Sequence, residues 1–296
     1  MAHYLDPKND LTFKRLFGEH KHLCMDFLNA VMPLSRPIEE IEYLSPEQVP
    51  DSPTKKYSIV DVKCRDGKGR QFIIEMQMFW TAGFYNRIVF NAGKAYVRQL
   101  DRNEEYHLLQ PVYTLALLNY KFDRITDKFY HHYQIVNKAN TEEIIPGLEF
   151  VLIELEKFRP ETMSDRRLMV LWLRFLNEVG EDMKSLPPEL QENEHIRQAA
   201  ELCEEGAFTP EEREAYDHYW DVIRTEKTSR EGARREGLAE GLAKGEAKGL
   251  AKGLKKGEEK GLALGLKKGE AERAKLEAER AKLAARIAEL ERKISK

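Results

Sequence analysis

Hydrophobic residues recur at spacings of three and four near the start of the chain, which predicts an amphipathic helix over residues 9–32. Asn9 or Asp10 is placed to cap this helix, and Pro33 and Pro37 close it. A short strand is expected over residues 38–44. The following segment, 45–56, is rich in Pro, Ser and Asp and indicates a loop.

A β-hairpin is the clearest pattern in the N-terminal half. Residues 57–65 and 70–79 have strand character, and Asp66, Gly67 and Gly69 between them are typical turn residues. Helical spacing then predicts a helix over residues 83–102. Residues 108–120 form a nearly unbroken apolar run, which suits a central strand buried on both faces.

The remainder of the folded part alternates between strands and helices. Further strands are expected over residues 127–137 and 149–158, and helices over 164–180, 189–206 and 210–229. The order of helix, strand, hairpin, helix and strand predicts an α/β sandwich with a mixed sheet.

The C-terminal tail has a different pattern, in which every fourth residue from Gly237 to Gly269 is glycine. Nine glycines in a helix interior cost roughly 9 kcal/mol relative to alanine, so an isolated helix should not hold. The alternatives are a self-associating helix and a flexible, weakly helical linker. Residues 270–296 favour self-association, because their leucines and isoleucines form the heptad seam of a coiled coil: Leu276, Leu283, Ile287, Leu290 and Ile294.

Charge and cysteine usage narrow the class of protein. Residues 131–229 hold 11 basic and 22 acidic residues, whereas residues 230–296 hold 19 and 12. A basic tail can attract nucleic acid, although helices of mixed charge are usually only solvated.

Cys24, Cys64 and Cys203 are scattered in apolar segments, which is typical of a reducing compartment. No signal segment and no membrane-spanning stretch is evident, so we expect a cytoplasmic protein.

The predicted hairpin brings carboxylates together. Glu75 and Gln77 point to the same face of their strand, and the hairpin places Asp61 close to them. Two carboxylates converging between apolar flanks suit a hard cation such as Mg²⁺ or Mn²⁺, which polarises a phosphodiester and acidifies water. The alternative is an exposed hairpin face on which Asp61 and Glu75 are merely solvated.

Four segments, in this order, resemble the PD-(D/E)XK nuclease family transposases, also called the Rpn family of recombination-promoting nucleases. They are NDLTFKRLFG (9–18), IVDVKCRD (59–66), IIEMQ (73–77) and LLNYKF (117–122). The resemblance covers roughly residues 1–230, and the glycine-rich tail is also familiar in this family. It implies a restriction-endonuclease-like αβββαβ core with a mixed sheet, followed by helices and a long C-terminal helical or coiled-coil tail.

The resemblance also implies roles for the hairpin residues. Asp61 and Glu75 fall on the family's metal ligands, and Gln77 falls on the usual lysine of the motif. Glutamine carries no charge but can orient a water by hydrogen bonds. The proline of the motif is also missing, since Val60 precedes Asp61.

Four further residues match or neighbour the family's motifs. Asp10 is an outer-shell or additional metal ligand, or else a helix N-cap. Lys14 and Arg87 are candidates for contact with the DNA backbone, with a solvated face or a surface salt bridge as the alternative. Lys63, two residues after Asp61, is a candidate substitute for the missing lysine and a third DNA-binding residue.

These observations lead to a hypothesis and one alternative from another class. The chain is expected to be a Mg²⁺-dependent DNA endonuclease, a phosphodiester hydrolase that the resemblance links to recombination, mobile elements or phage defence. The alternative is an inactive nuclease-like domain that acts as an oligomeric interaction or DNA-binding protein. The expected segments are a nuclease-like core (1–160), a helical extension (161–229), the glycine repeat (230–269) and a coiled coil (270–296), the tail mediating homo-oligomerisation.

Overall fold

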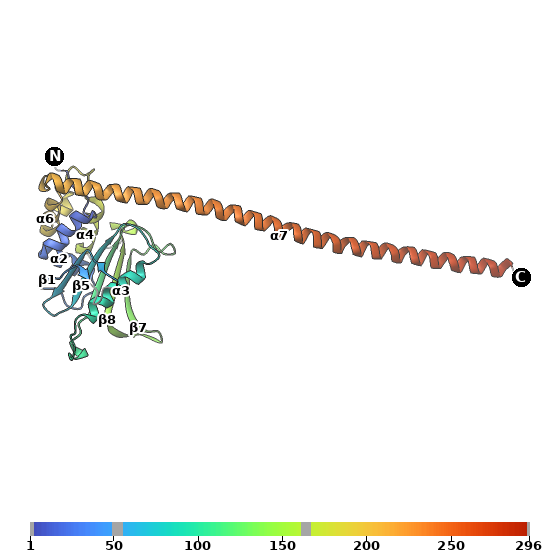
Figure 1. Ribbon diagram of the computed structural model, residues 1–296, viewed down its shortest axis with the longest axis horizontal. Helices are drawn as coiled ribbons and strands as arrows, with labels where there is room; N and C mark the ends of the chain where they lie inside the picture. Colours follow the sequence, from blue (N-terminus) through green and yellow to red (C-terminus); the bar gives the residue numbers. More distant parts are fainter. Residues whose placement is uncertain (1–2, 49–55, 161–166, 295–296) are drawn as a thin grey trace. The chain divides into compact units, whose positions relative to one another are not determined.

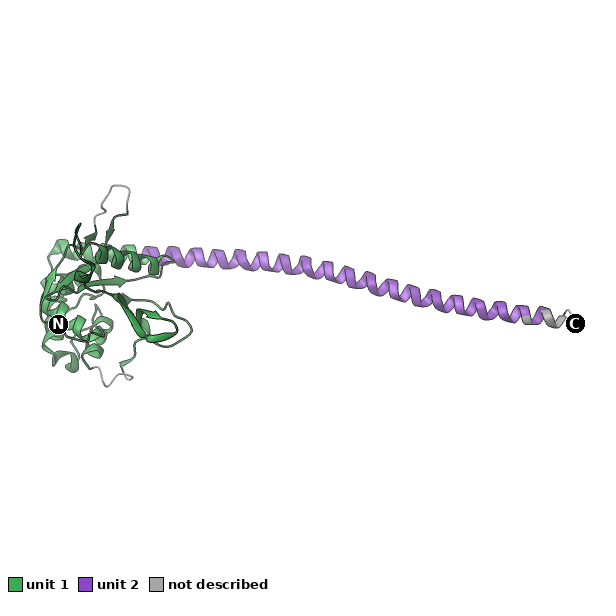
Figure 2. Ribbon diagram, turned by 90° about the horizontal axis from the view of Figure 1, so that it is seen from below, with its two compact units in different colours: residues 1–224 green, residues 225–296 purple. Residues whose placement is uncertain are grey.

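The computed structural model describes residues 3–48, 56–160 and 167–294. They form two compact units, residues 1–224 and residues 225–296 (Figure 2). Three predicted segments lie partly outside the described residues. They are the start of the expected helix 164–180, the last two residues of the expected coiled coil (295–296) and most of the 45–56 loop.

The first unit is built on a six-stranded mixed sheet with the strand order β1-β4-β5-β6-β8-β7 (Figure 1). β1, β4 and β5 are antiparallel, β5, β6 and β8 are parallel, and β7 returns antiparallel to β8. The strands are β1 (Ile41–Tyr43), β4 (Val62–Asp66), β5 (Gln71–Gln77), β6 (Val112–Leu118), β7 (Tyr130–Asn137) and β8 (Asn140–Glu154). A separate pair joins β2 (Glu47–Gln48) to β3 (Ser58–Ile59). The expected αβββαβ order and mixed sheet are confirmed.

Helices cover both faces of this sheet. On one face lie α1 (Asp10–Lys14), α2 (Lys21–Val31), α4 (Arg167–Glu178) and α6 (Glu194–Leu202), and on the other lies α3 (Phe84–Val97). Alternation along β5 divides its side chains, so that Phe72 and Ile74 enter the larger core while Ile73 packs against α3. Both faces of β6 are buried, as its apolar run predicted.

Three predicted elements are interrupted in the structure. The expected helix 9–32 is split, because Arg15–Glu19 form a π-helical turn (η1) and His20 leaves the helical conformation. The expected strand 57–65 breaks between Ile59 and Val62, because β3 pairs with β2 and β4 pairs with β5. The expected helix 189–206 is divided into α5 (Pro188–Gln191) and α6, whose N-cap is Asn193.

The hairpin turn is fixed by Asp66 and Gly69. The side chain of Asp66 accepts hydrogen bonds from the backbone amides of Lys68 and Arg70, and it forms a 2.7 Å ion pair with the Arg70 guanidinium. Gly69 has a φ of 84°, a conformation that favours glycine. The turn residues expected from the sequence are therefore confirmed.

The tail is helical throughout its described length, within α7 (Pro210–Ile294). Around each glycine from Gly237 to Gly269, a Cβ atom would meet nothing within 4 Å. The glycine stripe of a single chain is therefore unoccupied by other protein atoms. Within the described residues, the remaining short helices are η2 (Tyr106–Leu108), η3 (Leu155–Lys157) and η6 (Glu205–Ala207).

We predict that Phe17→Ala destabilises the fold by about 3–5 kcal/mol, because it empties the centre of an aromatic cluster. Phe17 is fully buried, and its ring centroid lies 4.6 Å from that of Phe27 and 5.6 Å from that of Trp172. Urea unfolding of the full chain measures the loss. Phe90→Ala removes the same side chain from an exposed position on α3 and should cost about 1 kcal/mol or less; equal losses would contradict the assignment of the core.

Candidate metal centre at the end of the central strands

Asp61 lies in the break between β3 and β4, next to the end of β5. Val60 before it packs against the α3 side of the sheet, whereas Val62 after it packs into the larger core. Asp61 Oδ2 accepts a 2.7 Å hydrogen bond from the backbone amide of Met76. This bond holds the carboxylate against β5 between the positions of Glu75 and Gln77.

Glu75 lies on β5 and is almost completely buried, at 5% exposure. Two side chains of α3 hold its carboxylate: Asn91 Nδ2 donates to Oε1 at 3.0 Å, and Arg87 Nη2 donates to Oε2 at 3.3 Å. Arg87 also donates a hydrogen bond to Gln77 Oε1. Arg87 and Asn91 are four residues apart, so they share one face of the helix.

Asp10 and Lys14 reach the same region from α1. Asn9 is the N-cap of α1, since its side chain accepts the Leu11 amide, so the alternative interpretation of Asp10 as the N-cap is wrong. Asp10 instead forms a 2.9 Å ion pair with Lys14, and about half of each side chain is exposed.

The charges of Glu75 and Asp10 act on Asp61. The pKa of Asp61 is raised to about 7, mainly by burial and further by the charges of Glu75 and Asp10, while the Met76 amide and Lys14 oppose the shift. Burial also raises the pKa of Glu75, against the charge and hydrogen bonds of Arg87 and Asn91. Acidic side chains from α1, the β3–β4 break and β5 therefore converge at one edge of the sheet.

The convergence fits a hard divalent cation. Asp61 has a single hydrogen bond, through Oδ2, within the described part of the chain, and no ion pair offsets its charge there. Asp61 is half-buried, so its other oxygen is open to a further ligand, and a cation would offset the cost of partly withdrawing this charge from water. The oxygen-rich donor set of Asp61, Glu75 and Asp10 is the type that Mg²⁺ and Mn²⁺ prefer.

Lys63 was predicted as a site residue, but in the structure it does not contact the carboxylates of the candidate metal centre. It lies opposite Ile73 in the β4–β5 pairing, on the α3 side of the sheet. Burial and the nearby charge of Arg98 lower its pKa. Within the described residues, Lys63 makes no ion pair with either Asp61 or Glu75.

Two residues near the carboxylates were missed in the sequence. Asn91 lies one helical turn after Arg87, so its spacing from Arg87 could have indicated that it faces Glu75.

Tyr219 lies in α7 within the first unit, one turn after Tyr216. The backbone carbonyl of Tyr216 accepts a 3.2 Å hydrogen bond from Asn9. Burial raises the pKa of Tyr219, and the charges of Asp10 and Asp61 raise it further. No local sequence pattern predicts that Tyr219 lies near these carboxylates, because this proximity joins the two ends of the first unit.

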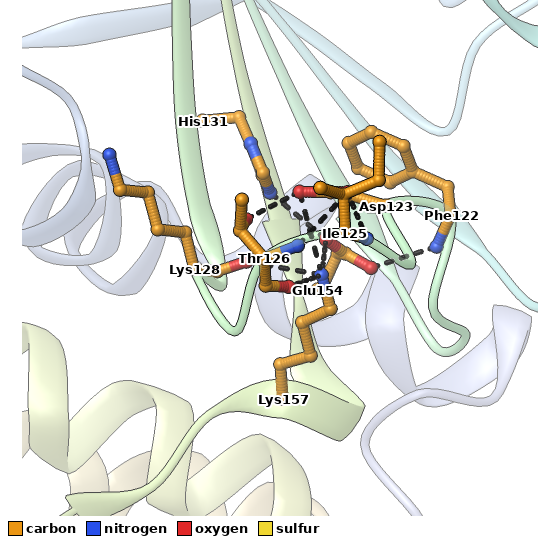
Figure 3. A network of polar contacts seen from close by, with 8 residues as sticks. All are labelled: Phe122, Asp123, Ile125, Thr126, Lys128, His131, Glu154 and Lys157. Carbon is orange, nitrogen blue, oxygen red and sulfur yellow. Dashed lines mark hydrogen bonds and ion pairs between the residues drawn. The ribbon is translucent and has the colours of Figure 1, made fainter.

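A second acidic cluster lies at the same edge of the sheet, where Asp123, His131 and Glu154 place ligand atoms within 4.8 Å of one another (Figure 3). Such a group could hold a metal ion, but a cation of the protein already lies there. Lys157 Nζ is 2.7 Å from Glu154 Oε1 and 3.9 Å from Asp123 Oδ2. Glu154 also lies 2.9 Å from His131 and accepts the Phe122 amide. This cluster is therefore a largely satisfied network that anchors the loop between β6 and β7.

The comparisons with known proteins agree with this architecture. The family model for PD-(D/E)XK nuclease family transposases matches residues 7–231, so the chain belongs to this family. Neither a curated protein nor a solved structure matches the chain. Among the described helices, none is both long and apolar enough to cross a membrane.

The raised pKa of Asp61 predicts how the stability of the metal-free protein depends on pH. The folded state holds a proton up to about pH 7, whereas the unfolded chain releases it near the ordinary value of 3.8. Stability should therefore fall as the pH rises between these values, by at most about 1.4 kcal/mol per pH unit. Urea unfolding across this range measures the slope.

Asp61→Asn is the matched variant for this measurement, because the amide can still accept the Met76 amide but carries no charge. Its unfolding midpoint should depend less steeply on pH and should exceed that of the wild type at pH values above about 7. An unchanged pH slope would show that Asp61 titrates normally.

Proposed function

We propose that the chain is a divalent-metal-dependent DNA endonuclease. The observation that carries this proposal is the convergence of Asp61, Glu75 and Asp10 at the edge of a sheet whose family is named for nucleases and transposases. Asp61 and Glu75 are the metal ligands, and Asp10 is an additional ligand in the inner or outer shell. A bound Mg²⁺ or Mn²⁺ supplies a Lewis acid that polarises a phosphodiester and acidifies water.

Gln77 and Arg87 divide the role that a lysine has in the family's motif. The Oε1 atom of Gln77 accepts from Arg87, and its amide group keeps its own hydrogens to position a water or a phosphate oxygen. The Arg87 guanidinium, 3.3 Å from Glu75, supplies the positive charge that glutamine lacks. This arrangement favours Arg87 over Lys63 as the replacement for the missing lysine. Lys14 and Arg87 are also the proposed contacts to the DNA backbone.

The biological setting follows from the family alone. Its members are called transposases, which supports DNA as the partner and a role in recombination or the movement of mobile elements, with phage defence as a further context. The proposed domain plan remains a core over 1–160, a helical extension over 161–229, the glycine repeat over 230–269 and a coiled coil over 270–296.

Cleavage of supercoiled plasmid DNA tests the proposed chemistry. Asp61→Asn and Glu75→Gln should each lower the rate with Mg²⁺ by roughly a hundredfold or more, because a metal contributes several kcal/mol of transition-state stabilisation. Asp101→Asn, a neutralised carboxylate on the exposed surface after α3, should cleave at the wild-type rate. Wild-type activity in Asp61→Asn would rule the assignment out.

Calorimetric titration separates this enzyme from an inactive nuclease-like domain. The active centre should bind Mg²⁺ or Mn²⁺, and Glu75→Ala should abolish that binding. An inactive domain that works only through interactions should show no such metal binding in the wild type.

We further propose that the tail forms homo-oligomers. The seam residues are about half or more exposed in the single chain: Leu276 (59%), Leu283 (60%), Ile287 (56%) and Leu290 (48%). Pairing would bury this seam and would bring glycine stripes close enough to offset their low helix propensity. A twofold dimer would provide two active centres, one for each strand of a duplex.

Light scattering of the full chain tests the oligomer. The wild type should have a multiple of the single-chain mass, and Leu283→Lys with Ile287→Lys should reduce it to that of one chain. Ala278→Lys with Ala285→Lys places the same charges outside the seam and should leave the mass unchanged. A wild type with the mass of one chain would contradict the proposal.

A further inference from the structure

A connected group of aromatic rings lies beside the candidate metal centre, at the same edge of the sheet. We define the aromatic patch as Trp80, Phe84, Tyr85, Tyr120, Phe122 and Tyr133. Its rings come from the segment after β5, the start of α3, the loop after β6, and β7.

The rings of the patch contact one another in a continuous network. The ring centroid of Trp80 lies 5.4 Å from that of Tyr85, 5.9 Å from that of Phe122 and 6.0 Å from that of Tyr120. The Tyr133 hydroxyl acts on Tyr85 and contributes to the raised pKa of that phenol, after the larger effect of burial. The network therefore extends from the end of β5 to β7.

Packing alone does not explain the patch, because its outer rings are exposed. Trp80 is 37% exposed, Tyr85 40% and Tyr133 41%, whereas Phe84 beneath them is completely buried. The patch therefore presents partly exposed aromatic rings to the outside. Large exposed aromatic groups of this kind commonly mark binding surfaces.

The patch is joined to the proposed metal centre through Arg87. The Arg87 guanidinium carbon lies 5.7 Å from the ring centroid of Phe84, while its nitrogen donates to Glu75 and Gln77. Trp80 follows Gln77 by three residues, a span of at most roughly 11 Å. Trp80 is therefore within a few nucleotides of the proposed centre along a bound strand.

Charge and hydrogen-bonding capacity beside the rings match a nucleic-acid strand. The loop that carries Phe122 also carries the exposed cations Lys121, Arg124 and Lys128. The hydroxyl of Tyr120 is buried and has no hydrogen-bond partner within the described residues.

We propose that the aromatic patch stacks unpaired bases next to the cleaved phosphodiester, so that the substrate is single-stranded or locally opened DNA. This inference rests on the proposed function, whose substrate it specifies. Bases in an intact duplex have their faces covered by their neighbours, whereas unpaired bases stack on exposed aromatic side chains. The neighbouring cations contact the backbone of the same strand.

Binding without cleavage tests the proposal. The full-length protein is titrated, without added divalent ion, into fluorescein-labelled oligothymidylate of about 20 nucleotides, longer than one such site covers. Trp80→Ala and Tyr85→Ala should each raise the Kd at least about fivefold, as expected for the loss of one stacked base. Trp80→Phe keeps a ring and should bind within about twofold of the wild type.

Two controls separate stacking from general damage. Tyr106→Ala removes a tyrosine that is 85% exposed and lies outside the patch, and it should bind like the wild type. A duplex of the same length should bind more weakly than the single strand and should respond little to Trp80→Ala. The oligonucleotide should also quench tryptophan fluorescence more strongly in the wild type than in Trp80→Phe, because Trp172 is completely buried and Trp220 lies outside the patch.

The inference is overturned if Trp80→Ala and Tyr85→Ala bind the single strand as tightly as the wild type. It is equally overturned if these variants change the mass of the protein in solution without changing DNA binding, since the patch would then be a protein interface. Asp61→Asn should bind the oligonucleotide normally while failing to cleave. A failure of the cleavage assay is therefore distinguishable from a failure of stacking.

Discussion

The hydrogen bond from the Met76 amide to Asp61 joins the break before β4 to the end of β5, and it holds one carboxylate beside another. Burial makes the charged form of both carboxylates unfavourable and raises their pKa values, and the charge of Glu75 adds to the shift of Asp61. The rest of the site offsets part of that cost. Arg87 and Asn91 satisfy both oxygens of Glu75. The stability of the surrounding core must therefore exceed the remaining cost of holding these carboxylates together.

Different faces of helix α3 contact the sheet, the acidic centre and the aromatic patch. Ile88, Ala92 and Ala95 are buried against the sheet. Arg87 and Asn91 reach Glu75, and Phe84 at the start of the helix supports the exposed rings. Since these side chains are one to three turns apart on one rigid helix, the acidic centre and the aromatic patch keep a constant separation.

Much of the fold was predictable from periodicity, because the hairpin, the buried β6 run and α3 are signalled by neighbouring residues. The proximity of Asp61, Glu75 and Gln77 was also predictable, since a hairpin and an ordered set of motifs bring them together. The interruptions of the predicted helix 9–32 and strand 57–65 were not predictable. The π-helical turn at Arg15–Glu19 and the strand break at Asp61 depend on tertiary packing. The same holds for Tyr219, whose place beside Asp10 joins positions that are about two hundred residues apart.

The Lys157 ammonium is covalently attached to the chain, so it cannot leave the acidic cluster that it neutralises. The acidic cluster at Asp123 and Glu154 contains its own covalently attached counterion, whereas the metal ion proposed for the centre at Asp61 and Glu75 would be exchangeable. A chelator can strip an exchangeable ion but cannot extract a side chain. The loop after β6 thus stays anchored when the protein is depleted of metal, and the ring of Phe122 that it carries stays in position.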